Sequence, residues 1–291
     1  MGEPVQFKEL LAPIRQALER LPEHRSGKNT RYSLTEAGLS AFAVFYMQSP
    51  SFLAYQRDMQ RQRGRNNAQS LFGVAQIPSD SQLRNLLDPV APAGLRSPFW
   101  EFHAQLKATG HLDAYISVAR TYLLSFDGSQ YFGSEKVHCA NCRVTLREGQ
   151  PHYSHGVLLA VLGAPGQEAV ICLEPEFITP QDGHDKQDCE QQALKRWVKR
   201  NADHFEAWQV TVLADDLHAH QPVCELLLEK HMHFILTCKV ESHPALYEEL
   251  ELLAGVEGAI STRRARQWNG RFHEEWIYQW ASDLPLRGDA K

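Results

Sequence analysis

The sequence predicts a mixed α/β protein that begins with a mostly helical region. In the N-terminal third, apolar residues recur with a helical period, as at Leu11, Ile14 and Leu18. From Thr121 onward β-rich runs take over, and the predicted order of elements is β-β-β-α-β-α-β. Three consecutive strands followed by alternating helices and strands indicate a mixed sheet, antiparallel at its start and parallel later.

The helical region has clear start signals. Ser33 followed by Glu36 three residues later is typical of a helix N-terminus, and it opens an apolar segment. Four segments predict helices: residues 7–21, 37–47, 78–87 and 99–109. We expect a helical domain over residues 1–110.

The α/β region follows. Strand patterns cover residues 121–127, 152–162, 168–173, 208–214 and 233–239, with helices over residues 186–202 and 221–230. This order matches a ribonuclease H-like five-stranded mixed sheet, which we place over residues 111–244. Residues 245–291 contain a helix pattern and then strand-like segments.

The composition narrows the class of protein. With 43% hydrophobic and 22% charged residues, the chain has the composition of an ordinary globular protein. It has no apolar run of about 18 residues and no signal-peptide pattern, so we expect neither a membrane partner nor secretion. Six cysteines in 291 residues are no disulfide framework and favour a reducing cytoplasm. The net charge of −5 argues against a protein that coats nucleic acid by bulk charge alone.

Two aspartates come directly after apolar runs, where predicted strands end. Asp127 follows residues 122–126, and Asp215 follows residues 208–214. The first and fourth strands of this fold are neighbours, about 5 Å apart. Carboxylates placed there can share Mg²⁺ or Mn²⁺ ions for phosphoryl chemistry. The alternative is that both aspartates only terminate strands, as aspartate often does at turns.

Two nearby residues compete for roles at this point. Asp216 follows Asp215, but adjacent strand residues point to opposite faces, and we prefer Asp215 because it directly follows the apolar run. His218 either orients a phosphate or begins the next helix, and both readings stay open.

A second group of candidate ligands is sulfur-based. Cys139 and Cys142 form a CxxC motif, followed by His152 and His155. Such a set can bind a structural Zn²⁺ ion, although His152 and His155 are predicted to face opposite ways on a strand. The alternatives are a redox-active CxxC pair and simple reduced cysteines in a hairpin.

Basic residues gather in two places. Arg57, Arg61, Arg63 and Arg65 form one cluster, and Arg263, Arg264 and Arg266 form the other. Each cluster alone is also compatible with solvated surface. Beside a phosphoryl-transfer site they become candidate contacts to DNA phosphates. Asp185 and Lys186 are further candidates, unless the polar residues 181–190 only form a capped helix start.

Several of these motifs, in this order, resemble bacterial insertion-sequence transposases of the DDE superfamily. The segments that carry the resemblance are Phe126-Asp-Gly-Ser129, His138-Cys-Ala-Asn-Cys142, Gln181-Asp-Gly183 with Asp188-Cys-Glu190, Leu213-Ala-Asp-Asp-Leu-His218 and Phe234-Ile-Leu-Thr-Cys-Lys239. Ile77-Pro-Ser-Asp80 with Arg84 is similar to the helical leader of this family. The resemblance covers about residues 30–290.

The resemblance implies cut-and-paste DNA transposition with Mg²⁺ or Mn²⁺. It implies binding to terminal inverted repeats and target double-stranded DNA, a possible homodimer on paired DNA ends, and a nucleoid-associated location in the bacterial cytoplasm. Asp127 and Asp215 match the first two acids of the family's triad. The third, a glutamate in a Tyr-Arg-Glu-Lys-like motif on a late helix, has no match, so we expect a chain truncated before it. The resemblance also implies a β-rich insertion before that glutamate, and we expect residues 245–291 to be its incomplete start. The alternatives are a catalytically incomplete DNA-binding regulator of transposition and, more distantly, a metal-dependent nuclease of another lineage.

Overall fold

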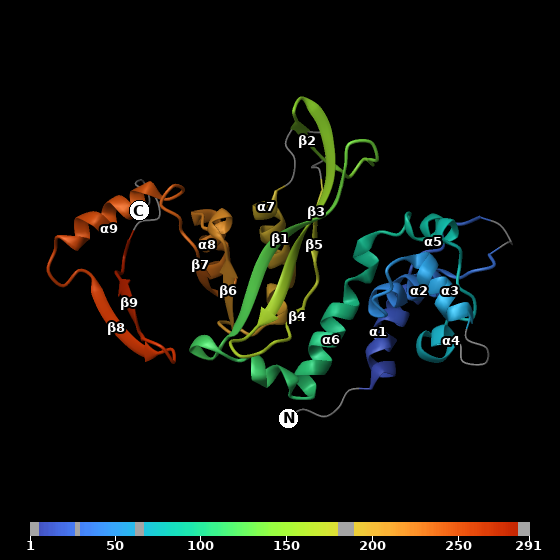
Figure 1. The fold of residues 1–291 in the computed structure, drawn as a ribbon, viewed down its shortest axis with the longest axis horizontal. Helices are drawn as coiled ribbons and strands as arrows, with labels where there is room; N and C mark the ends of the chain where they lie inside the picture. The colour runs from blue at the N-terminus through green and yellow to red at the C-terminus, as the bar shows by residue number, and fades with distance from the viewer. Residues whose placement is uncertain (1–5, 27–29, 62–66, 180–188, 285–291) are drawn as a thin grey trace. The chain divides into compact units, whose positions relative to one another are not determined.

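The computed structural model describes residues 6–26, 30–61, 67–179 and 189–284, apart from the side chains of residues 60, 61 and 67. The chain divides into two compact units (Figure 1). The helical unit comprises Met1–Ile116 with Cys172–Glu174, and the sheet unit comprises Ser117–Ile171 and Pro175–Lys291. Within the described ranges, no helix combines the length and apolarity needed to cross a membrane.

Among the described residues, the helical unit contains the four helices that the apolar periodicity predicts and two more, over residues 52–61 and 67–72, that it does not predict. They are α1 (Phe7–Glu19), α2 (Leu34–Tyr46), α3 (Phe52–Arg61), α4 (Asn67–Phe72), α5 (Asp80–Leu87) and α6 (Ser97–Ala108), with the 3-10 turns η1 (Pro92–Leu95) and η2 (His111–Tyr115). Their shared core includes Leu18, Leu39, Tyr55 and Phe72. Gly38 lets α1 and α2 approach closely, because a Cβ atom there would lie 2.2 Å from the Leu18 side chain.

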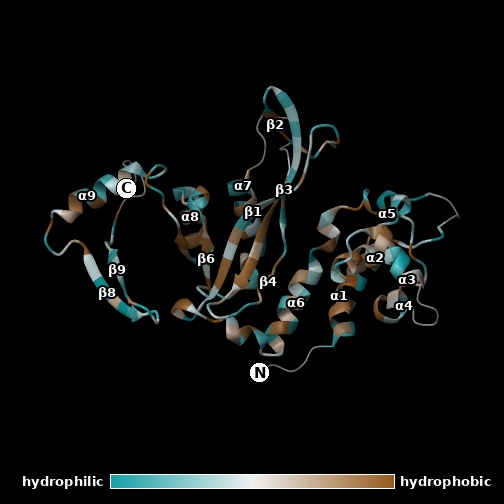
Figure 2. Cartoon of the chain, in the orientation of Figure 1, coloured by the Kyte–Doolittle hydropathy of each residue, from teal (hydrophilic) through white to brown (hydrophobic). Residues whose placement is uncertain are grey.

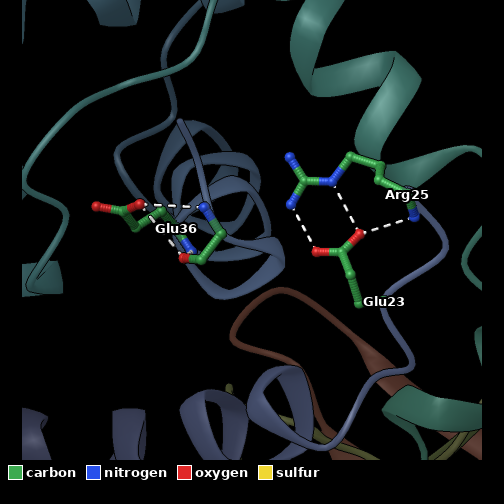
Figure 3. Close-up of polar contacts among 4 residues, drawn as sticks. Glu23, Arg25 and Glu36 are labelled. Carbon is green, nitrogen blue, oxygen red and sulfur yellow. Dashed lines mark hydrogen bonds and ion pairs between the residues drawn. The ribbon is translucent and has the colours of Figure 1, made fainter. Parts of the chain in front are cut away.

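Local polar contacts fix the ends of these helices. Ser33 caps α2 through a hydrogen bond from the Glu36 amide to its hydroxyl at 3.0 Å, and the Glu36 carboxylate accepts from the Ser33 amide in return. Figure 3 shows this contact beside the Glu23–Arg25 pair, in which the guanidinium donates to both carboxylate oxygens. These hydrogen bonds from Arg25 lower the pKa of Glu23 to about 2.

The sheet unit has the ribonuclease H-like order of strands that the sequence predicts. Its strands are β1 (Tyr122–Ser134), β2 (Arg143–Arg147), β3 (Gln150–Gly163), β4 (Ile171–Cys172), β5 (Glu176–Ile178), β6 (Val210–Ala214) and β7 (His233–Leu236). The strand order is β2-β3-β1-β6-β7, with β4 and β5 also paired to β3. β1 is antiparallel to β3 and parallel to β6, and β7 is parallel to β6. The sheet therefore combines antiparallel strands at its start with parallel strands later, as the sequence predicts.

Three strands differ from the sequence-based expectation, and one of them, β2, was not predicted. The first does not end at Asp127 but continues to Ser134, because β3 still pairs with it after β6 has ended. The third strand, expected over residues 168–173, is reduced to the two-residue β4, and β5 pairs with the middle of β3. Glu176, buried in β5, explains this shift, since its carboxylate binds Arg196 and Arg200 on the helix that packs beside it.

The remaining elements complete the sheet unit. They are η3 (Val118–Arg120), α7 (Glu190–Asn201), η4 (Ala202–His204), η5 (Asp216–His218), α8 (Gln221–Glu229), α9 (Pro244–Ala254), β8 (Ser261–Trp268) and β9 (His273–Trp280). Figure 2 shows apolar residues concentrated on β6, whereas β8 and β9 are largely hydrophilic. These last two strands pair only with each other among the described strands, as a two-stranded antiparallel sheet.

Candidate active site

The strand register brings Asp127 and Asp215 opposite each other. The parallel pairing of β1 with β6 ends at Ser125 opposite Leu213. Two residues further along each chain stand Asp127 and Asp215. Neighbouring strands are about 4.8 Å apart, so the two carboxylates emerge side by side where β6 leaves the sheet. Both residues are exposed to solvent there.

Asp215 and Asp216 have different surroundings. Asp215 precedes η5, and its Oδ1 accepts a hydrogen bond from the Leu217 amide at 3.1 Å. Asp216 instead accepts from the Lys239 amide at 2.7 Å and from the Ser242 hydroxyl at 2.5 Å. These bonds, the one from Ser242 foremost, lower the pKa of Asp216. Asp216 thus anchors the segment after β7, which leaves Asp215 as the carboxylate at the sheet edge.

A third carboxylate, Glu190, lies with them. Glu190 is the first residue of α7, and it reaches over Gly128 of β1. A Cβ atom at Gly128 would lie 2.2 Å from the Glu190 carboxyl carbon, so only glycine leaves this space open. Burial raises the pKa of Glu190, and repulsion from Asp215 and then Asp127 raises it further, while Arg143 lowers it. The Glu190 carboxylate therefore feels the negative charge of both aspartates.

This role of Glu190 was not predicted from the sequence, in which the residue lies in a capped helix start. The chain holds no local motif that joins Glu190 to Asp127 or Asp215. The one available signal was Gly128 directly after Asp127, a residue that permits close approach of another side chain.

Packing fixes α7 against the sheet. Trp197 is fully buried, and its ring meets that of Phe126 at 4.9 Å in an edge-to-face contact. At the start of the helix, the Gln191 side-chain amide donates to the Leu217 carbonyl at 2.8 Å. The first turn of α7 is thereby tied to η5, directly beside Asp215.

The three carboxylates form a set of hard oxygen ligands of the kind that Mg²⁺ and Mn²⁺ prefer. The ligand oxygens of the three carboxylates do not all lie within 4.8 Å of one another. Among the described residues, the group that meets this limit is Cys139, Cys142 and His155. Two ions about 3.5–4 Å apart, sharing carboxylates between them, accommodate such a spread.

His218 lies in η5 rather than at the start of α8, which begins at Gln221. Its side chain is buried, and its Nδ1 has no hydrogen-bond partner among the described residues. Burial lowers the pKa of His218, although Asp215 and Asp127 oppose the shift. His218 is therefore a neutral imidazole at neutral pH, close to both aspartates.

Three of the four predicted zinc ligands come together on the other half of the sheet. The Nε2 atom of His155 lies 3.4 Å from Cys139 Sγ and 3.3 Å from Cys142 Sγ, and the two sulfur atoms are 3.9 Å apart. Burial raises the pKa of the Cys142 thiol.

His152 does not join this cluster. It faces the other side of β3, beside Gly133, where a Cβ atom would lie 3.2 Å from the imidazole. Its Nδ1 is buried without a hydrogen-bond partner in the described chain. Adjacent strand positions alternate between faces, so residues three apart in β3 cannot both reach one ion.

The N-terminal basic cluster is described only in part. Arg57 is exposed on α3. Arg61 is the last residue of α3, but its side chain is not among those that the structure describes. Arg63 and Arg65 lie outside the described residues. Asp185 and Lys186, candidates for contact with DNA, also lie outside the described residues.

The C-terminal basic cluster is split between the two faces of the β8–β9 hairpin. Arg264 and Arg266 share one face, and both approach the Glu275 carboxylate, at 3.4 and 3.8 Å. Arg263 lies on the opposite face, across from Tyr278. The three arginines therefore do not form one continuous positive surface.

Comparisons with known proteins give one distant structural similarity and no match in sequence. No family model and no curated protein matches the sequence. Among solved structures, the chain is similar to a piggyBac transposase in a synaptic complex with hairpin DNA, with 12% identity and a TM-score of 0.38. The match covers 88% of this chain and 53% of that one, so this chain spans about half the length of that protein. A TM-score of 0.38 is too low to assign this chain to that family.

Proposed function

We propose that this chain catalyses metal-dependent DNA strand cleavage and strand transfer in the manner of a DDE transposase. In this proposal Asp127, Asp215 and Glu190 bind Mg²⁺ or Mn²⁺. The observation that carries it is the convergence of three carboxylates from β1, from the end of β6 and from the start of α7.

The charges at the site fit a divalent cation. Burial, and then repulsion from Asp215 and Asp127, raises the pKa of Glu190, so the three groups in their ionised form destabilise one another. A nearby cation removes this repulsion, and oxygen ligands suit Mg²⁺ and Mn²⁺ better than softer metals. The alternative that these acids only terminate strands does not account for Glu190 lying over Gly128.

Each residue then has a distinct task. Asp127, Asp215 and Glu190 would hold Mg²⁺ or Mn²⁺, which when bound would activate the attacking water or 3′-hydroxyl and stabilise the leaving oxygen. Asp127 and Asp215 hold the metal at the sheet edge, and Glu190 adds a third ligand from the helix. The neutral imidazole of His218 supports the position of Asp215 or a phosphate beside it.

DNA enters this proposal as a partner held by positive charge. Arg57 and Arg263 are exposed and contact phosphates of the terminal inverted repeats or the target, together with the other arginines of their clusters. Two copies of the chain act on paired DNA ends.

Glu190 departs from the arrangement that the sequence resemblance implies. In that arrangement the third acid follows a β-rich insertion, whereas Glu190 precedes the second aspartate in the chain. The proposal therefore assigns metal binding to three residues that this chain already contains.

The test is cleavage of supercoiled plasmid and of double-stranded oligonucleotides by the full chain with Mg²⁺ or Mn²⁺. We expect Asp127→Asn and Asp215→Asn to reduce nicking by about 10³-fold or more, and Glu190→Gln by about 10²-fold, since each removes a ligand charge. Glu229→Gln, at the exposed end of α8, is the matched control and should keep wild-type nicking.

The outcomes separate the two function classes. Nicking that does not need a divalent metal, or that survives Asp127→Asn unchanged, overturns the proposal. Salt-sensitive DNA binding with no nicking by the wild-type chain also overturns it, and favours a non-catalytic regulator of transposition.

A further inference from the structure

A second group of ligands lies in the sheet unit and plays no part in the chemistry proposed above. Cys139, Cys142 and His155 each offer one ligand atom, and these atoms all lie within 4.8 Å of one another. No other group of three histidine, cysteine or acidic residues in the described ranges meets this criterion.

The distances suit a tetrahedral zinc ion. With Zn–S bonds of about 2.3 Å and Zn–N bonds of about 2.0–2.1 Å, tetrahedral angles require S···S near ~3.8 Å and S···N near ~3.6 Å. The observed Sγ···Sγ distance is 3.9 Å, and the two Sγ···Nε2 distances are 3.4 and 3.3 Å. A disulfide requires an S–S distance of about 2.05 Å, so the cysteines are not bonded to each other.

The surrounding structure orients each ligand. The Cys139 amide donates to Cys142 Sγ at 3.3 Å, and the Cys142 amide donates to the Cys139 carbonyl at 3.2 Å, which closes the CxxC turn. The imidazole of His155 is stacked on Tyr131, at 5.8 Å and 17°. Its Nε2 therefore points at the sulfur atoms from a ring with a fixed plane.

The connection between β1 and β2 lies over one face of β3. His138, directly before the CxxC turn, stacks on Tyr153 at 4.4 Å. Tyr153 and His155 are two residues apart and so share a face of the strand. An ion bound by Cys139, Cys142 and His155 would join this connection to the sheet.

We propose that Cys139, Cys142 and His155 bind a structural Zn²⁺ ion that fastens the β1–β2 connection to β3. These three ligands leave a fourth coordination position, which solvent can reach because Cys139 is exposed and His155 is only partly buried. The ion takes no part in DNA cleavage. Zinc binding and DNA nicking are therefore tested by separate measurements, and failure of one leaves the other unaffected.

The first measurement is the zinc content of the full chain, purified under reducing conditions and dialysed. We expect about one zinc per chain, lost in Cys139→Ser, Cys142→Ser and His155→Gln. Cys172→Ser, an exposed cysteine elsewhere, and His152→Gln, on the other face of β3, are the matched controls and should keep the metal. Circular dichroism checks that each variant is folded.

Cobalt substitution of the wild-type chain tests the ligands without any variant. We expect the visible bands of tetrahedral Co²⁺ and a near-ultraviolet charge-transfer band of the intensity that two thiolates give. A wild-type chain that takes up neither Zn²⁺ nor Co²⁺ overturns the proposal. Retention of zinc by the Cys142→Ser variant, or loss of zinc from His152→Gln but not from His155→Gln, does the same.

Discussion

The carboxylate site and the Cys139–Cys142–His155 cluster are built from the same sheet, but in different ways. The cluster takes its three residues from one short stretch, the β1–β2 connection and the facing strand β3. The carboxylate site takes its residues from β1, α7 and the end of β6, which are far apart in the sequence. Its geometry therefore depends on strand register and on helix packing, whereas the cluster depends on one local turn.

The largest expected effect comes from removing the packing that holds α7. Trp197→Ala deletes a fully buried ring against Phe126 and should lower the free energy of unfolding by about 3–5 kcal/mol. Because α7 carries Glu190, nicking should fall at denaturant concentrations where the Co²⁺ spectrum of the cysteine cluster is still intact. Urea titrations followed by both readouts measure this difference.

Trp208→Ala is the matched control for this prediction. Trp208 is 43% exposed, so its loss should change the free energy of unfolding by about 1 kcal/mol or less. If nicking and the cobalt spectrum of Trp197→Ala are lost at the same urea concentration, the carboxylate site does not depend on the packing of α7 more than the cysteine cluster does.

Gly128→Ala is expected to separate geometry from stability. The new methyl group would lie 2.2 Å from the Glu190 carboxyl carbon, and the end of that side chain would have to move. A displacement of about 1 Å at a reacting site can cost about 10²-fold in rate, so we expect a loss of that order in nicking. The midpoint of thermal unfolding and the zinc content should stay close to wild type.

Gly163→Ala provides the control, since a Cβ atom there has no neighbour within 4 Å. It should leave nicking unchanged. Wild-type activity in Gly128→Ala would show that the position of Glu190 over Gly128 is unimportant.

The same contrast explains what the sequence could predict. The Ser33 cap, the mixed sheet and four helices of the helical unit follow from local periodicity and capping chemistry, and the structure confirms them. The third strand was misplaced because Glu176, a charged residue, is buried there by two arginines that lie about 20 residues later. No local pattern predicts such long-range pairing.

The candidate sites follow the same rule. Cys139, Cys142 and His155 are visible as a motif, and only the face of β3 decides that His155 and not His152 joins them. Glu190 was missed because its relation to Asp127 exists only through the packing of α7 on β1. The register that places Asp127 opposite Asp215 could be inferred only once both strands were assigned to a known sheet order.

A smaller effect is expected at Asp216. Asp216→Asn weakens the bonds to Ser242 and the Lys239 amide and should lower the Tm by about 2–4 °C. Because this carboxylate anchors the segment after β7, most of the nicking activity should remain. A loss of nicking comparable to that of Asp215→Asn, at unchanged Tm, would instead place Asp216 in the metal site.

The smallest expected effect concerns how DNA reaches the carboxylates. Arg263→Gln should reduce the slope of log K against log salt for DNA binding by about 1, because an exposed guanidinium that contacts a phosphate is lost. Arg264→Gln should change the slope less, since Glu275 already offsets much of its charge from 3.4 Å. Fluorescence anisotropy across a salt series measures both slopes. Equal slopes for the two variants and the wild type would remove the hairpin from the DNA-binding surface and leave that role to Arg57 and the helical unit.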